Sequence, residues 1–377
     1  MKQGQVVIHQ LIPMLHARDA VGNHTLALRD ALRDNGVVSD IFVEHFDPNT
    51  KHETHLYTDL DVEEMVCNLF VYQVATASKM SRWLMERSEP FVINFHNITP
   101  PEYFEPWNRE IAQIQRNANA ELKLLALRSL AAISVSRFNE LQLEEIGFAN
   151  TKVLPPLILS SSSRKPSPRQ GEIPLLKWLS IGRIAPNKCL ENAISTLYFY
   201  NSLYKRSARL AIVGRCALPN YFRSLKVFAR DLGIAHMVDF VGTVEDEALG
   251  SYYSESDLLL VTSNHEGYCF PLVEAMNYEL LILARNAGAI GEVLGNSDLL
   301  VNTDSPIEFA RKVYKLEQVS ERDRVIARYG DQLESLGLNK ASGGYVELLT
   351  TLVTKNKAAA GNLTATNKAG SKHANAI

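Results

Sequence analysis

The chain has few cysteines, no long apolar run and no excess of charge of either sign. Its 377 residues include only Cys67, Cys189, Cys216 and Cys269, and no two of them form a C-x-x-C pair. This spacing argues against a disulfide framework or a cysteine metal site, and it is typical of a protein from a reducing cytosol. No apolar stretch approaches the roughly 18 residues of a membrane-spanning helix. We therefore expect a cytoplasmic protein with no metal site.

The formal net charge is only −3 at pH 7, so the chain lacks the basic excess of a nucleic-acid-binding protein. The first residues, 1–8, lead straight into a strand-like run, which is not the pattern of a signal peptide. Apolar residues make up 46% of the chain, enough for two cores, and the length exceeds that of a usual single domain. Two domains are expected, with no nucleic-acid partner.

Strand-like and helix-like segments alternate through both halves of the chain. The first half has strand-like runs at 6–9, 40–43, 69–72, 91–95 and 132–135, with helices over 26–35 and 111–130. The second half has them at 175–181, 208–213, 237–241, 257–261, 280–283 and 299–301. Alternation of this kind predicts parallel β-α-β units, and therefore an α/β fold.

A Ser/Pro-rich stretch at 159–171 separates the two halves and is typical of a linker. We predict an N-terminal domain over 1–156 and a C-terminal domain over 157–354, whose final helix can pack back on the first domain. The Ala-, Asn- and Lys-rich residues 355–377 are predicted to be disordered. Ligands of doubly wound domains bind outside the carboxyl ends of the strands, so two such domains that face each other define one interdomain cleft.

Two carboxylates eight positions apart, Glu266 and Glu274, follow the apolar run 258–262. The segment between them is expected to be a tight loop that runs into a helix, whose free N–H groups favour negative charge. The loop carboxylate can meet a reacting group, and the helical carboxylate can reach a ribose.

Cations follow another strand of the second half. Arg183 and Lys188 lie five positions apart on a loop that begins at Gly182, and together they suit a pyrophosphate. The alternative is a pair of solvated surface cations. Gly214 and Gly242 also end strands, where a glycine lets a ligand come close, although each can equally be a turn glycine.

The first half offers two candidates at strand ends. Gly22 lies in what we expect to be a short loop before the helix at 26–35, where backbone N–H groups can meet an anion. A plain turn with a helix cap is the alternative. His96 follows the run 91–95 and precedes a Pro-Pro turn, so it can offer a hydrogen bond in a cleft or serve a structural role.

Taken together, these motifs resemble a known family. Residues 182–188, 238–242 and 258–276 resemble, in order and spacing, the donor-binding half of the GT-B glycosyltransferases of family 4, the "glycosyl transferases group 1". The Gly22 loop and residues 96–104 and 133–139 fit the other half, so that the resemblance covers roughly residues 5–350. It implies the GT-B fold, with two Rossmann-like doubly wound domains that face an interdomain cleft.

The resemblance also implies catalytic roles. Arg183 and Lys188 would hold the diphosphate and stabilise the leaving group. Glu266 would lie beside the donor sugar, and His96 would reach it from the other domain.

Other residues would bind the donor without taking part in the chemistry. Glu274 would bind the ribose hydroxyls, and the strand-end loops would surround the rest of the donor. The remaining donor-binding candidates are Gly22, Gly214, Gly242 and Val244, the last two near the nucleobase, and the backbone of Tyr268, Cys269, Phe270 and Leu272, near the sugar and phosphate.

The implied activity is transfer of a hexose of mannose or glucose type from a UDP- or GDP-sugar, with retention and without a metal or cofactor. The acceptor would be a glycan, a glycolipid or another saccharide or lipid-linked molecule. Two other hypotheses stay open: a GT-B-like epimerase or phosphorylase, and a two-domain sugar-binding protein without catalysis.

The chain departs from the family pattern at Cys269 and at residues 289–293. Cys269 stands where glycine is more usual, and residues 289–293, Ala-Ile-Gly-Glu-Val, lack the usual Pro-Glu-Thr form. Separately, the basic, amphipathic segment 79–87 contains Trp83 and could touch an anionic membrane from the cytoplasmic side. An ordinary helix face is the alternative for this segment.

Overall fold

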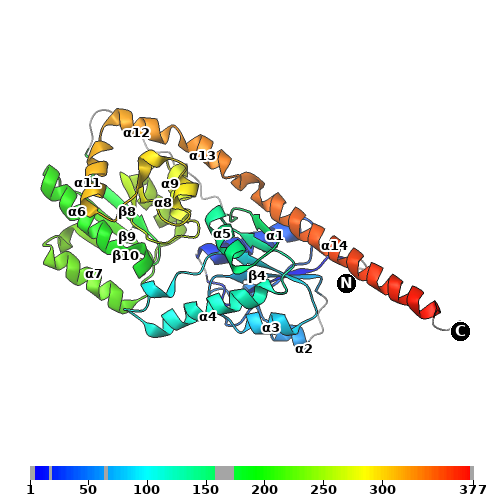
Figure 1. The fold of residues 1–377 in the computed structure, drawn as a ribbon. Coiled ribbons are helices and arrows are strands. Elements are labelled where there is room, and N and C mark those ends of the chain that lie inside the picture. The colour runs from blue at the N-terminus through cyan, green and yellow to red at the C-terminus, as the bar shows by residue number, and fades with distance from the viewer. Residues whose placement is uncertain (1–4, 17–18, 63–66, 158–173, 374–377) are drawn as a thin grey trace.

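The computed structural model of the protein describes residues 5–16, 19–62, 67–157 and 174–373, which form two parallel β-sheets with helices on both sides (Figure 1). The first sheet has the order β3-β2-β1-β4-β5-β6-β7 and the second the order β10-β9-β8-β11-β12-β13. The strands of the first sheet are β1 (Ile8–Ile12), β2 (Ile41–Val43), β3 (His55–Leu56), β4 (Leu69–Val74), β5 (Phe91–Phe95), β6 (Ala132–Ser134) and β7 (Thr151–Val153). Those of the second are β8 (Lys177–Ile181), β9 (Arg209–Val213), β10 (Val238–Gly242), β11 (Leu258–Val261), β12 (Leu281–Arg285) and β13 (Leu300–Val301).

Helices connect the strands in both domains. The N-terminal domain contains α1 (Ala20–Asp34), α2 (Asp59–Val62), α3 (Met80–Glu86), α4 (Arg109–Ala126) and α5 (Arg137–Ile146), with the 3-10 helices η1 (Lys51–Glu53) and η2 (Pro101–Tyr103). The C-terminal domain contains η3 (Pro186–Lys188), α6 (Leu190–Tyr204), α7 (Pro219–Asp231), η4 (Ala235–Met237), α8 (Asp246–Glu255), α9 (Phe270–Asn277), α10 (Ile290–Leu294), η5 (Ser297–Leu299), α11 (Pro306–Lys315), α12 (Val319–Ile326) and α13 (Tyr329–Ser335). The last helix is α14 (Leu338–His373).

The central strands are buried along their whole length, which is what sheets covered on both faces require. Every residue of β5 and of β11 is buried, and both strands are nearly continuous apolar runs. Each strand expected from the sequence overlaps an observed one, so the predicted α/β class with two doubly wound sheets is confirmed. The short strands β3 and β7 were not predicted, because two or three residues carry too little apolar pattern.

Helix α1 corrects one sequence prediction. It begins at Ala20 and not near Leu26, because the carboxylate of Asp19 caps its N-terminus and accepts hydrogen bonds from the N–H groups of Val21 and Gly22. Gly22 therefore lies in the first turn of a helix, not in a loop before one.

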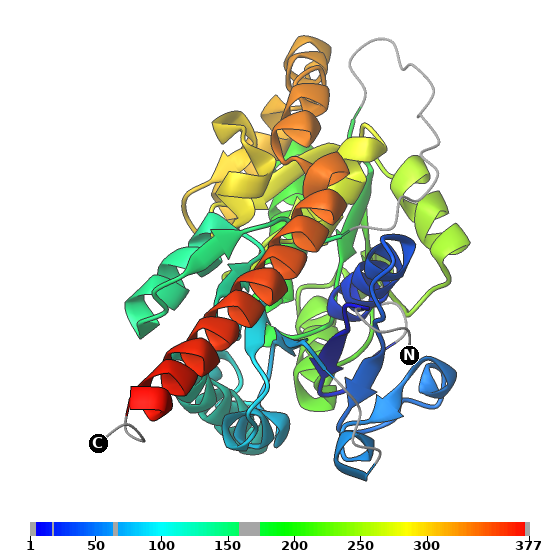
Figure 2. The same ribbon diagram turned by 90° about the vertical axis from the view of Figure 1, so that its right-hand side faces the viewer.

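Helix α14 continues to His373, so it includes residues 355–373 of the tail that was predicted to be disordered. Tyr345, Leu349 and Val353 of α14 are buried in the same apolar cluster as Ile8 and Leu28 of the N-terminal domain. Figure 2 shows α14 lying across that domain and projecting beyond it. The predicted linker, 159–171, lies outside the described residues.

Helix α3 contains most of the basic segment considered above for membrane contact. Its Met80 and Leu84 are buried, and the ring of Trp83 packs edge-on against Tyr57 and Phe70. The apolar side of α3 thus belongs to the core of the N-terminal domain. Over the described ranges of the chain, no helix combines the length and apolar character needed to cross a bilayer.

Candidate functional site

The loops that follow β8 and β11 are joined by an ion pair and by hydrogen bonds. The Lys188 ammonium lies 2.6 Å from Glu266 Oε1, and these side chains are only 17% and 10% exposed. Thr262 Oγ1 donates to the backbone oxygen of Cys189 at 2.9 Å, and Asn187 Nδ2 donates to that of His265 at 3.1 Å. Strand β8 pairs directly with β11, so the two loops emerge side by side at the carboxyl edge of the sheet.

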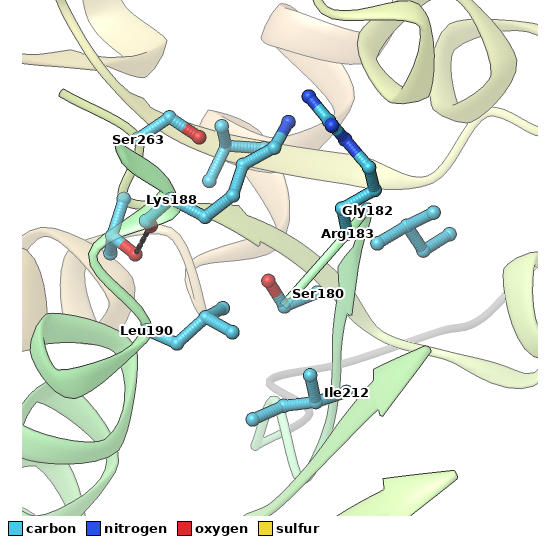
Figure 3. Close-up of a pocket in the computed structure, with 10 residues that line it drawn as sticks. Ser180, Gly182, Arg183, Lys188, Leu190, Ile212 and Ser263 are labelled. Atoms are coloured by element: carbon cyan, nitrogen blue, oxygen red, sulfur yellow. Dashed lines mark hydrogen bonds between the residues drawn. The ribbon is translucent and has the colours of Figure 1, made fainter. Parts of the chain in front are cut away.

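A small pocket opens at this edge, lined by residues of both loops (Figure 3). The side-chain nitrogens of Arg183 and Lys188 lie on the same side of it. Its volume of about 10 Å³ leaves room for roughly one water molecule. The Lys188 side chain lies over Gly182, since a Cβ there would be 3.2 Å from Lys188 Nζ. Arg183 is exposed and has no hydrogen-bond or ion-pair partner within the part of the chain that the structure describes.

The loop between Glu266 and α9 carries a strained residue. Cys269 has φ 70° and ψ 68°, which lie in the left-handed region that disfavours residues with a Cβ. Glycine adopts this conformation without strain, which explains why glycine is more usual at this position of the motif. Burial raises the pKa of the Cys269 thiol, so it is neutral. Neighbouring Tyr268 is also buried, and its hydroxyl has no partner among the residues described.

Glu274 lies in α9, eight residues beyond Glu266. Its Oε2 accepts a hydrogen bond from the hydroxyl of Tyr253 in α8. Burial raises the pKa of Glu274, while the Tyr253 hydrogen bond partly offsets that rise. One carboxylate oxygen is thus held by the protein, which fixes the direction of the other. Phe270 and Leu272 belong to the first turn of the same helix, and Leu272 is buried.

His96 follows β5 in the N-terminal domain. Burial lowers its pKa to about 3, so the ring is neutral at pH 7. Its Nε2 lies 2.7 Å from Gln73 Oε1, a carbonyl oxygen that only accepts, so Nε2 carries the proton and Nδ1 is left as an acceptor. The structure brings His96 to the Glu266 loop, since a Cβ on Gly267 would lie 2.9 Å from the His96 backbone oxygen.

The remaining predicted residues are distributed less tightly. A Cβ on Gly214 would lie 2.0 Å from the Gly182 backbone oxygen. The close contact between these two neighbouring strand ends is therefore enough to require a glycine at position 214, whether or not a ligand binds there. Gly242 has φ 84° and open space beside it, and Val244 packs against the C-terminal core. Gly22 donates its N–H to Asp19 Oδ1 at 3.0 Å, which occupies the group that was expected to meet an anion.

The two domains are joined by residues that were not among the predicted site residues. Ser136 Oγ donates to the Gly267 backbone oxygen at 2.8 Å, and His265 Nε2 lies 2.6 Å from Asn97 Oδ1. Glu292 accepts from the backbone N–H groups of Arg137 and Phe138. The sequence signals were the resemblance of segments 96–104 and 133–139 to the family and Ser136 as a typical helix N-cap; backbone N–H groups leave no trace in a sequence. No group of three or more His, Cys, Asp or Glu side chains suited to a metal occurs in the described ranges.

Residues 168–333 match the model of the family Glycosyl transferases group 1. Among curated proteins, the chain is 28% identical over 156 residues to the O-antigen chain mannosyltransferase RfbU of Salmonella typhimurium. That match spans 40% of this chain and 42% of the relative.

Solved structures resemble the chain over nearly its whole length. The sucrose-phosphate synthase of Thermosynechococcus elongatus has a TM-score of 0.71 at 15% identity, covering 94% of this chain and all of its own. The HepE protein of Anabaena in complex with UDP-glucose also has a TM-score of 0.71, at 17% identity, covering 92% of this chain and all of its own. At such low identity the similarity shows the fold alone, and the fold is that of the GT-B glycosyltransferases.

Proposed function

We propose that this protein is a retaining glycosyltransferase of family 4 that moves a hexose from a nucleotide-sugar to a saccharide or lipid-linked acceptor. The observation that carries the proposal is the position of Arg183 and Lys188 beside one pocket at the carboxyl edge of a Glycosyl transferases group 1 domain. Two adjacent cations of this kind suit a diphosphate, because Arg binds phosphate oxygens in a fork and Lys acts as a point charge.

The donor would bind by exchanging partners at the pocket. The diphosphate would draw the Lys188 ammonium away from Glu266 and would take the unpaired Arg183 guanidinium as a second contact. Both cations would then stabilise the negative charge that develops on the leaving nucleoside diphosphate. Release from Lys188 would free the Glu266 carboxylate to accept hydrogen bonds from hydroxyls of the donor sugar.

Other residues would orient the donor. Glu274 would accept from the ribose hydroxyls through the oxygen that Tyr253 does not bind. Neutral His96 would present its Nδ1 as a hydrogen-bond acceptor from the N-terminal domain. Gly242 and Val244 would lie along the nucleobase. The reaction proposed here uses no metal and no cofactor beyond the nucleotide-sugar, because the cations and the start of α9 supply positive charge at the leaving group.

The donor sugar is proposed to be mannose or glucose. The mannosyltransferase RfbU supports mannose, and the complex of HepE with UDP-glucose supports glucose. Both a UDP- and a GDP-sugar fit the proposal. We further propose that the protein works in the cytoplasm, where it would reach a lipid-linked acceptor by peripheral contact with the membrane surface.

A panel of UDP- and GDP-sugars tests this function. Thermal unfolding with each compound identifies the donor, because a bound ligand stabilises the folded state. Turnover of that donor with candidate acceptors, followed by NMR of the product's anomeric proton, then tests transfer and retention. Arg183→Ala and Lys188→Ala are expected to lower kcat about 100-fold, whereas Arg230→Ala, an exposed cation on α7, should not.

The other hypotheses appear as distinct outcomes of this test. Binding without turnover would indicate a sugar-binding protein, and conversion of the donor without acceptor into an isomeric nucleotide-sugar would indicate an epimerase. Phosphorolysis of a glycan would indicate a phosphorylase. Any of these results would contradict the proposed transfer.

A further inference from the structure

The helix α5 of the N-terminal domain is capped by a side chain of the other domain. We infer that Glu292 is a positioning residue, which holds the two domains together and thereby sets the place of the Glu266 loop against the N-terminal domain. The inference about catalysis rests on the proposed function, but the domain contact itself can be tested without it.

The first three N–H groups of α5 have no partners within their own helix, as at any helix start. The Arg137 N–H donates to Glu292 Oε1 at 2.8 Å, and the Phe138 N–H donates to Oε2 at 3.2 Å. The third, from Asn139, donates to the hydroxyl of Ser136 at 3.2 Å. A carboxylate placed there also meets the positive end of the helix dipole, so Glu292 provides both hydrogen bonds and charge.

The segment before Glu292 is packed against the backbone of Glu266. The Ala289 N–H donates to the Glu266 backbone oxygen at 3.0 Å. A Cβ on Gly288 would lie only 2.3 Å from that same oxygen, so the two backbones are in direct contact. Glu292 thus connects α5, through α10 and the 288–289 turn, to the residue that binds Lys188.

Other contacts between the domains involve the two residues next to Glu266. Ser136, which caps α5, donates its hydroxyl to the Gly267 backbone oxygen, one residue beyond Glu266. His265, one residue before Glu266, meets Asn97, the neighbour of His96. Both sides of Glu266 are therefore tied to the N-terminal domain. Glu292 itself is solvent-exposed, so breaking the contact leaves its carboxylate hydrated rather than buried without a partner.

The test compares Glu292→Ala and Glu292→Gln with Glu334→Ala, an exposed glutamate on α13 that serves as a matched control. Fluorescence energy transfer between Cys216, the one exposed cysteine among the described residues, and a Lys123→Cys label on α4 reports the distance between the domains. Steady-state kinetics with the identified donor provide kcat and KM, and thermal unfolding reports folding.

Glu292→Ala is expected to lower about tenfold the ratio of molecules whose domains are in contact to molecules whose domains have separated, which corresponds to about 1.4 kcal/mol. Its kcat should fall while the KM for the donor changes less than twofold, since the predicted donor contacts lie mostly in the C-terminal domain. Glu292→Gln keeps one acceptor oxygen, so its kcat and its ratio of domain arrangements should lie between those of Glu292→Ala and of the unmodified protein.

An unchanged distance distribution in Glu292→Ala would overturn the inference, whatever happens to the activity. Equal losses in Glu292→Ala and Glu334→Ala would do the same. If the unmodified protein turns over no nucleotide-sugar, the proposed function fails; the distance measurement still decides whether Glu292 holds the domains together.

Discussion

Lys188 Nζ lies 2.6 Å from Glu266 Oε1, so the proposed phosphate-binding cation and the proposed sugar-binding carboxylate are partners before a donor arrives. Breaking such a mostly buried pair leaves one charge uncompensated, at a cost of about 3 kcal/mol. Lys188→Met and Glu266→Gln should each destabilise the protein by about that amount. Together they should cost clearly less than the sum, as measured by urea unfolding. Additive costs would show that the pair is not coupled in solution.

Glu274 offers a test of the ribose contact. Glu274→Ala is expected to weaken binding of the donor nucleotide about 10- to 100-fold, the loss of a hydrogen bond that involves a charged group. Titration calorimetry with the nucleoside diphosphate and its 2′,3′-dideoxy analogue distinguishes the contact from general damage. The unmodified protein should discriminate between the two ligands, and the variant should bind both equally weakly. Tyr253→Phe, which only removes the partner of Glu274, should retain part of the discrimination.

Gly267 leaves no room for a side chain. A Cβ at this position would lie 2.5 Å from Asn97 Cβ and 2.9 Å from the His96 backbone oxygen, both in the N-terminal domain. Gly267→Ala is therefore expected to hold the domains apart, to raise the radius of gyration in X-ray scattering and to lower kcat at least tenfold. Gly330→Ala, where a Cβ meets nothing within 4 Å, is the control. Normal activity in Gly267→Ala would mean that the domains need not meet in this way.

Cys269 should accept glycine and reject a branched side chain. Its left-handed backbone costs about 1–2 kcal/mol in a residue with a Cβ. Cys269→Gly relieves that strain and loses a small buried side chain, so the free energy of unfolding should change by no more than about 1 kcal/mol. Cys269→Val should lose more than about 2 kcal/mol, since β-branched residues tolerate positive φ worst. Cys216→Val, at an exposed site, controls for the chemistry of the change.

The buried histidines predict a loss of stability in acid. Burial lowers the pKa of His96 to about 3 and that of His9 to about 4, and it also lowers those of His24 and His265. Unfolded histidine titrates near 6.5, so between that pH and the folded pKa the unfolded chain binds more protons. Stability should therefore be complete above about pH 6.5 and fall as the pH is lowered, by about 1.4 kcal/mol per pH unit for each such histidine.

Urea unfolding at pH 7, 6 and 5 measures this slope. His96→Gln should make it shallower by one proton, while His52→Gln, at an exposed position, should leave it unchanged. A slope that His96→Gln does not alter would mean that His96 is already protonated in the folded protein.

The sequence predicted the sheets well because a strand buried on both faces is an apolar run, as in β5 and β11. It also placed Arg183, Lys188 and Glu266 on loops at one sheet edge, which the order β8-β11 confirms. The ion pair between Lys188 and Glu266 could not be predicted, because it joins residues 78 positions apart whose side chains can each face solvent instead.

The start of α1 was misplaced for a local reason. Gly22 was assigned to a loop, whereas the carboxylate of Asp19 caps the helix and moves its beginning to Ala20. The contact of Glu292 with α5 could not be predicted, because it is not local. Its partners are backbone N–H groups 154 and 155 residues away, and almost every residue of any chain has such a group. Residues that join domains are thus harder to predict than residues that line one loop.

Helix α14 has a consequence for how the protein is made. Tyr345, Leu349 and Val353 cover apolar residues of β1 and α1, so part of the N-terminal core is supplied by the far end of the chain. During synthesis, the partners of Ile8, Leu28 and Leu32 in α14 are made only after more than 300 further residues have been added. The N-terminal core is therefore complete only once α14 has been made, whereas all strands of the C-terminal sheet, 177–301, precede α14 in the chain.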